Sequence, residues 1–424
     1  MTLTIHRGTH EIGGSCVELT TASSRLFLDF GLPLVDRQGN QVKLKKESHP
    51  TLSELIDSGL SPSIPYFLNR DDRATHLLLS HSHLDHYGLA PWLPADIPVY
   101  ASKGTKKLLE LALYFNQSTF DPSAVITIEP WKPIQLGDFT ITPYLADHSA
   151  IDAFSFLIEA EGQRVFYSGD LRSHGRKGVL FENLIAKPPK DIDYLILEGS
   201  MLGREIANYE TEEDVEGKLV KELSKEGLYL ASFSSQNIDR FVSFFKACRR
   251  TKRTLVVDPY TAYVLDSLRN ISSGIPQHDW KDSFRVFNIP NTATNKMALD
   301  KSLFKFKHAK ITPEEIHSDP THLVIKENSM IRRILKNKGM LSGATDLYSM
   351  WDGYLKDDSF WLDNGVPVVK IHCSGHAYKD DLIALVESMK PKRVIPNHTF
   401  HPEAFNDMFG KKTLLLQDGQ ALEL

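Results

Sequence analysis

The stretch Thr75-His-Leu-Leu-Leu-Ser-His-Ser-His-Leu-Asp-His-Tyr-Gly88 decides the fold of this chain. Its apolar run, Leu77 to Leu79, predicts a short buried strand, and Gly88 marks the turn that follows. Between them stand four candidate metal ligands: His81, His83, Asp85 and His86. Imidazole and carboxylate together suit zinc or a similar divalent ion, and open coordination positions suit catalysis. The stretch therefore predicts a catalytic metal site at a strand end.

The composition describes an ordinary globular chain. Its 424 residues are enough for two or three domains, and the net charge of −5 means that a nucleic-acid partner would have to be held by a local groove. Three widely spaced cysteines without a C-x-x-C pattern, Cys16, Cys248 and Cys373, predict a reducing compartment. The amino terminus has no apolar signal core, and no apolar run approaches the roughly 20 residues of a membrane span. We expect a soluble, cytoplasmic chain without a membrane partner.

Further polar side chains follow predicted strands. Asp29 ends the expected strand 25–29, where a carboxylate is also a common turn former. His148 follows the alternating segment Phe139–Leu145, and an isolated histidine there is often structural. Asp170 closes the turn Ser168-Gly-Asp170 after another short strand, and a carboxylate held in this way can bridge two metal ions.

The alternation of strands and helices predicts an α/β chain built in three segments. Residues 1–200 include expected strands 3–6, 16–20 and 192–197 and a helix at 105–115, with a solvated loop near Lys43–Lys46. Residues 201–365 start a fresh set of strand–helix units, with helices at 211–225 and 236–249 and strands at 228–233 and 254–257, which predicts a second, parallel sheet. Residues 366–424 return with a strand at 366–371, the run His372-Cys-Ser-Gly-His376, a helix at 379–389, and a strand that ends in Pro396-Asn-His398.

Several of these features resemble one known family. The H-x-H-x-D-H spacing that starts at His81 is that of the metallo-β-lactamase superfamily. The chain also resembles the β-CASP nucleases, in which an α/β domain interrupts this core and the motifs H-x-S-G-H and a strand-end P-x-H follow it. The sequence of these two motifs is most similar to that of the ribonuclease J group. The resemblance implies a metallo-β-lactamase αββα sandwich with an inserted β-CASP α/β domain. Bacterial ribonuclease J proteins carry a further carboxy-terminal domain, which we expect to be absent because only residues 399–424 follow His398.

The resemblance also implies residue roles. One zinc ion would be held by His81, His83 and His148, and the other by Asp85, His86 and His398, with Asp170 as the bridge and manganese as the alternative metal. Asp29 would orient the ligating histidines from outside the ligand set. The two ions would activate a shared hydroxide. Catalysis would involve Asp85, His376 as general acid and Glu198 to orient His376.

Two further expectations concern contacts with the substrate. By the same resemblance, His372 and Ser374 would touch a substrate phosphate, although they could equally cap the following helix. The basic run Lys246, Arg249, Arg250, Lys252 and Arg253 would either guide a nucleic-acid backbone or form a solvated helix end. Arg172 and His174 would either line the cleft or lie at the surface.

The predicted function is a metal-dependent ribonuclease that acts on single-stranded RNA as a 5′-to-3′ exonuclease, an endonuclease or both. A DNA nuclease of the Artemis-like kind is the first alternative, and a histidine at position 398 argues against it. A second alternative is a small-molecule metallo-hydrolase, and the large insertion argues against it. A third is a nucleic-acid-binding protein with an inactive catalytic site, and the complete set of candidate ligands argues against it. The sequence leaves the oligomeric state open.

Overall fold

The structure is a computed structural model that describes residues 1–36, 40–42, 50–204, 210–356 and 358–424. It divides into two compact units, which we describe separately: residues 1–207 with 375–424, and residues 208–374. The loop expected at Lys43–Lys46 lies outside the described residues. Within the described parts of the chain, no helix has both the length and the apolar character needed to cross a membrane.

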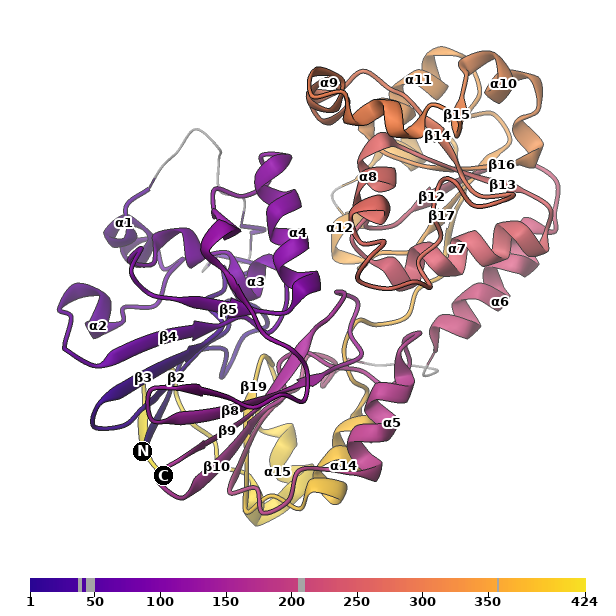
Figure 1. Ribbon diagram of the computed structural model, residues 1–424. Coiled ribbons are helices and arrows are strands. Elements are labelled where there is room, and N and C mark those ends of the chain that lie inside the picture. Colours follow the sequence, from indigo (N-terminus) through magenta and orange to yellow (C-terminus); the bar gives the residue numbers. More distant parts are fainter. Residues whose placement is uncertain (37–39, 43–49, 205–209, 357) are drawn as a thin grey trace. The chain divides into compact units, whose positions relative to one another are not determined.

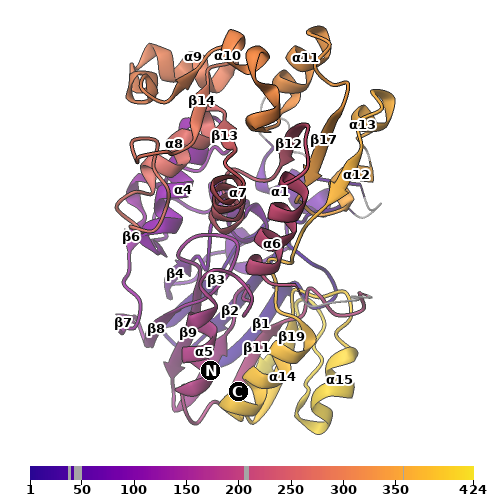
Figure 2. The same ribbon diagram turned by 90° about the vertical axis from the view of Figure 1, so that its right-hand side faces the viewer.

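Two sheets form the centre of the first unit (Figure 1). The first sheet has the order β20 (Ala421–Glu423), β1 (Thr2–Arg7), β2 (Cys16–Thr20), β3 (Ser24–Leu28), β4 (Ala74–Leu78), β5 (Val99–Ala101), β6 (Ile126–Thr127). The second has the order β19 (Arg393–Asn397), β11 (Tyr194–Glu198), β10 (Gln163–Tyr167), β9 (Phe154–Ala160), β8 (Phe139–Leu145), β7 (Ile134–Leu136). The chain ends lie side by side, because β20 pairs antiparallel with β1 (Figures 1 and 2).

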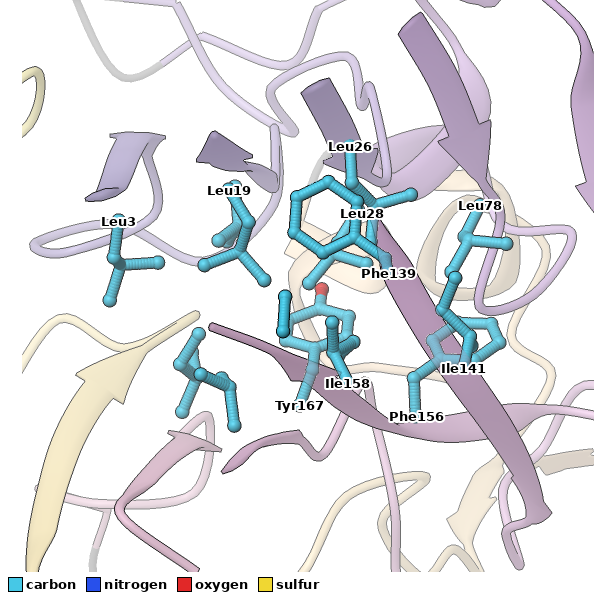
Figure 3. Packing of buried hydrophobic residues seen from close by; sticks show 14 of the residues in the cluster. Leu3, Leu19, Leu26, Leu28, Leu78, Phe139, Ile141, Phe156, Ile158 and Tyr167 are labelled. Atoms are coloured by element: carbon cyan, nitrogen blue, oxygen red, sulfur yellow. The ribbon is translucent and has the colours of Figure 1, made fainter. Parts of the chain in front are cut away.

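The two sheets face each other across an apolar core. Side chains from β3, among them Leu26 and Leu28, meet Phe139 and Ile141 of β8 and Ile158 of β9, as Figure 3 shows. These side chains alternate along each strand, as expected for sheets with one face turned to the core. The sequence analysis did not predict the strand at 154–160, which pairs with β8 and β10 in the middle of the second sheet.

Helices cover the outer face of each sheet. Against the first sheet pack α1 (Leu52–Asp57), α2 (Pro65–Leu68), α3 (Leu84–Tyr87) and α4 (Lys103–Tyr114). Against the second pack α5 (Gly178–Ala186), α14 (Lys379–Met389) and α15 (Ala404–Phe409). The first unit is therefore the predicted αββα sandwich (Figure 1).

The second unit is an α/β domain around one parallel sheet. Its strand order is β15 (Lys310–Ile311), β14 (Arg285–Phe287), β13 (Thr254–Val257), β16 (Leu323–Lys326), β12 (Leu228–Ser232), β17 (Ala344–Tyr348), β18 (Val368–Lys370). The helices are α6 (Glu212–Leu223), α7 (Ile238–Arg250), α8 (Pro259–Ser267), α9 (Thr292–Leu299), α10 (Pro313–Ser318), α11 (Ser329–Asn337), α12 (Gly353–Lys356) and α13 (Phe360–Asp363). Strands β12 and β17 run side by side (Figure 2).

One expectation about the second unit needs correction. We expected the strand at 366–371 to start the return into the first sandwich. Instead β18 pairs with β17, with Tyr348 opposite Lys370, and the second unit extends to residue 374. An apolar run shows that a strand forms, but it does not show which sheet the strand joins.

Candidate active site

The candidate ligands of the first unit lie at or just after the ends of strands. Asp29 follows β3, and the turn after β4 carries His81 and His83 and leads into α3, which holds Asp85 and His86. His148 follows β8, Asp170 follows β10, Glu198 ends β11 and His398 follows β19. Side chains from six segments of the sequence meet here because parallel strands present their carboxyl ends at one edge of a sheet.

Asp170 lies at the centre of the cluster. Its carboxylate is 3.1 Å from His86 Nε2, 3.5 Å from His398 Nδ1 and 3.7 Å from His81 Nε2. It is also 3.9 Å from His148 Nε2. Burial alone would raise the pKa of Asp170, but His398 and His86 hold it well below its usual value.

Two groups of three side chains flank Asp170. His81, His83 and His148 place one possible ligand atom each within 4.8 Å of one another, and so do Asp85, His86 and His398. In the first group His148 Nε2 lies 3.2 Å from His83 Nδ1, and in the second His398 Nε2 lies 3.3 Å from Asp85 Oδ2. The structure thus brings together the two sets that the sequence analysis assigned to separate metal ions.

The neighbouring groups fix the orientation of the histidines. Asp29, with no exposed surface, accepts hydrogen bonds from His86 Nδ1 at 2.8 Å and from the Ser80 backbone N–H at 2.7 Å. His148 Nδ1 donates to the Gly375 carbonyl at 2.6 Å. Consequently His148 Nε2 presents a lone pair toward the other histidines, as a metal ligand must.

The chemistry of this cluster fits divalent cations. Two of its buried atoms, His81 Nε2 and Asp170 Oδ1, make no hydrogen bond, and the contact of His86 Nε2 with Asp170 Oδ2 is an ion pair at 3.1 Å. Burying a polar atom without a partner costs about 1–3 kcal/mol, so native cores rarely gather several such atoms in one place. Burial also lowers the pKa of His81 and His148 well below the usual value, so both rings are neutral at pH 7 and can donate a lone pair to a cation.

His376 and Glu198 form a pair beside this cluster. His376 Nδ1 lies 3.3 Å from Glu198 Oε1, and the backbone N–H of Ser200 donates to Glu198 Oε2 at 3.0 Å, which anchors the carboxylate. Burial lowers the pKa of His376, but the charges of Glu198 and Asp170 outweigh it and raise the pKa to about 9. The ring keeps 24% of its surface exposed, so a protonated imidazole here can reach a bound molecule.

His372 and Ser374 belong to the second unit. The buried Arg240 donates to His372 Nδ1 at 2.9 Å and to Glu212 Oε1 at 3.0 Å. Because a guanidinium only donates, the neutral His372 ring carries its proton on Nε2. Surrounding protein and the charge of Arg240 lower the pKa of His372 to about 4, although the side chain keeps an exposed edge. The N-cap residue of α14 is Tyr378, whose backbone N–H donates to Asp381 Oδ2 at 3.1 Å.

The other basic residues singled out in the sequence differ in burial. Arg172 is buried and lies 3.5 Å from Asp147, and the ring of His174 stacks on Tyr378 with centroids 4.3 Å apart, so neither is a surface residue. In the basic run on and after α7, Arg253 donates to the backbone carbonyl of Leu223 at 2.7 Å. Lys246, Arg249, Arg250 and Lys252 are exposed.

Sequence reasoning missed three hydroxyl groups of the site. Ser80 Oγ and Tyr167 Oη each donate to Asp29 Oδ2, at 2.7 Å and 2.8 Å. Ser200 Oγ lies 2.8 Å from His398 Nδ1. Each stands within three residues of a recognised ligand or carboxylate, which is the only signal that the sequence offers, because serine and tyrosine are common at strand ends.

Comparisons with known proteins agree with this geometry. Residues 55–211 match the model of the "Beta-lactamase superfamily domain". This part of the chain is therefore a metallo-β-lactamase superfamily domain. Residues 366–404 match the model of a "Zn-dependent metallo-hydrolase RNA specificity domain", and this segment contains His376 and His398.

The chain is similar to several curated ribonuclease J proteins. Ribonuclease J of Mycoplasma genitalium is 21% identical over 351 residues, which cover 80% of this chain and 60% of the relative. Ribonuclease J of Helicobacter pylori is 21% identical over 426 residues, which cover 92% of this chain and 55% of the relative. Transcription termination factor FttA of Methanothermobacter thermautotrophicus is 27% identical over 224 residues, which cover 48% of this chain and 32% of the relative.

The chain therefore spans at most 60% of the length of these relatives. A crystal structure of a protein of unknown function from Enterococcus faecalis V583 has the same fold, with a TM-score of 0.80 and 21% identity, and the match covers 100% of this chain and 99% of that one. The family relationship and the cluster of histidines and aspartates together identify a metal-binding site.

Proposed function

We propose that this chain is a metal-dependent ribonuclease that hydrolyses phosphodiester bonds of single-stranded RNA, as a 5′-to-3′ exonuclease, an endonuclease or both. The observation that carries the proposal is the convergence of two ligand groups on Asp170, beside the proton-carrying pair of His376 and Glu198. The match of residues 366–404 to an RNA specificity domain supports RNA over other substrates.

In this proposal one zinc ion would be held by His81, His83 and His148 and another by Asp85, His86 and His398, and the Asp170 carboxylate would be available to both. Two such ions supply an activated water at neutral pH and neutralise the charge of the reacting phosphate. Manganese can replace zinc at a site of nitrogen and oxygen ligands.

The chain's own residues orient the ligating histidines and supply a proton to the leaving group. Asp29 holds the His86 ring with Nδ1 turned away from the cluster, and Gly375 does the same for His148. Glu198 holds Nδ1 of His376, so this imidazolium would give its proton from Nε2 to the leaving ribose 3′-oxygen. His372, with its proton on Nε2, and Ser374 are our proposed contacts to a substrate phosphate.

The test compares matched 5′-monophosphorylated and 5′-hydroxyl single-stranded RNAs with the same sequence as DNA, all digested by the zinc-loaded chain. We expect cleavage of RNA by the wild type and by the control His322→Ala, which changes an exposed histidine of the second unit, and loss of cleavage in His376→Ala. Release of mononucleotides from the monophosphorylated RNA would indicate an exonuclease, and internal cuts an endonuclease. Preferential cleavage of DNA, or no cleavage of either, would refute the proposal.

A further inference from the structure

A pair of exposed aromatic side chains follows β17 in the second unit. Trp351 keeps 47% of its surface exposed and Tyr354 keeps 48%. Their ring centroids are 5.3 Å apart at an interplanar angle of 88°, an edge-to-face arrangement. Burying a tryptophan side chain stabilises a fold, so leaving one half exposed forgoes part of that gain.

The backbone around Trp351 fixes where its ring lies. A Cβ atom added at Gly353 would overlap the six-membered ring at Cζ3 and Cη2, so this ring position requires glycine there. Tyr348 Oη donates to the Trp351 carbonyl at 2.9 Å. Tyr354 packs against the same ring at nearly a right angle. The backbone of Trp351 is therefore anchored by Tyr348, and its ring packs against Gly353 and Tyr354.

Hydrogen bonds tie this aromatic pair to the end of β18. The Ile371 N–H donates to the Tyr348 carbonyl at 2.9 Å, and Lys370 Nζ lies 2.8 Å from Asp352 Oδ2. His372, the proposed phosphate contact, comes directly after Ile371. Arg240 links the two segments as well, since it donates to Ser349 Oγ at 2.5 Å and to His372. One edge of this sheet thus carries a hydrogen-bond donor for a phosphate and an exposed ring.

We propose that Trp351, with Tyr354 beside it, is a stacking site for an unpaired base of single-stranded RNA. The inference rests on the proposed function and adds to it a residue that binds the base rather than the phosphate. An indole offers a flat surface to any of the four bases, so the site would read single-strandedness and not sequence. Paired bases are already stacked, so a duplex cannot use this ring.

The experiment measures the affinity of the zinc-loaded full chain for a single-stranded RNA whose phosphorothioate linkages resist hydrolysis. Trp351→Ala should weaken binding about thirty-fold, the middle of the range for loss of one stacked base. Trp351→Leu, which keeps apolar bulk without an aromatic ring, should weaken it similarly, whereas Trp351→Phe should keep most of the affinity. Trp280→Ala is the matched control, because Trp280 is a half-exposed tryptophan elsewhere in the same unit, and it should bind as the wild type does.

An RNA with one abasic nucleotide provides the second arm. As the abasic position moves along the strand, one position should weaken binding by the wild type but not by Trp351→Ala, because the base and the ring are then partners. Equal affinity of Trp351→Ala and Trp280→Ala in a chain that cuts RNA would overturn this inference alone, as would retained affinity in Trp351→Leu. A wild type that neither binds nor cuts RNA would overturn the proposed function as well.

Discussion

Replacing Asp29 by asparagine tests how the protein holds its metal ligands. The Asp29 carboxylate accepts hydrogen bonds from Ser80 Oγ, His86 Nδ1 and Tyr167 Oη on Oδ2, and from the Ser80 N–H on Oδ1, all between 2.7 and 2.8 Å. An asparagine can keep its carbonyl oxygen toward the three donors only by turning its own amide toward the Ser80 N–H, where two donors then face each other.

The cost follows from this geometry. One charge-assisted hydrogen bond is worth about 1.5–3 kcal/mol, and the other bonds of Asp29 weaken when the acceptor loses its charge. Changing a residue that orients a metal ligand typically lowers metal affinity 10–100-fold, so we expect a loss of roughly that size for Asp29→Asn.

Zinc affinity is measured by competition with a chromogenic chelator, and folding is checked by circular dichroism. Asp191→Asn is the matched control, because Asp191 is exposed and has φ of 54°, close to the 61° of Asp29, so both substitutions meet the same backbone conformation. The control should bind zinc as the wild type does. Wild-type affinity in Asp29→Asn would refute the idea that Asp29 positions His86 for a metal ion.

Three further predictions concern stability. Removing divalent cations with a chelator should lower the unfolding temperature, and added zinc should restore it, because a cation that binds only the folded chain stabilises it; an unchanged unfolding temperature would contradict the metal site. Burial and the neighbouring charge of Glu327 raise the pKa of Asp346 to about 8. In the unfolded chain this carboxyl group has its ordinary pKa of about 4, so the folded chain binds one more proton between these two pH values. The free energy of unfolding should therefore fall as pH rises from about 4 to about 8, by up to about 1.4 kcal/mol per pH unit. Urea unfolding of Asp346→Asn should show a weaker fall, and an identical slope in both proteins would mean that the buried carboxyl group is ionised. Gly31→Ala should destabilise the fold by about 1–3 kcal/mol or more, because the new methyl group would overlap the backbone carbonyl of Asp85. Gly217→Ala in α6 places its methyl group in open space and should stabilise the fold by up to about 1 kcal/mol. Equal changes in the free energy of unfolding would refute this interpretation of the contacts.

Local patterns predicted much of the fold. The alternating segment at Phe139–Leu145 and the helix at Lys379–Met389 have the predicted bounds, because periodicity and capping act over a few residues. The helix expected from Thr211 begins one residue later, since the Thr211 hydroxyl accepts from the Asp214 N–H and caps the helix. Strand β9 and the sheet membership of β18 were missed, because strand pairing depends on residues far away in the chain.

Residue type and local spacing are enough to identify the candidate ligands. The spacing from His81 to His86 and the positions of Asp170 and His398 after predicted strands are visible in the sequence. Only the tertiary structure decided how they are used. It put Asp170 between two ligand groups, gave His148 a carbonyl partner at Gly375, and brought Ser200 to His398 across 198 positions of sequence. The physical reason is that ligand chemistry belongs to side chains and short spacings, whereas the orientation of each ring depends on hydrogen bonds that long-range strand pairing creates.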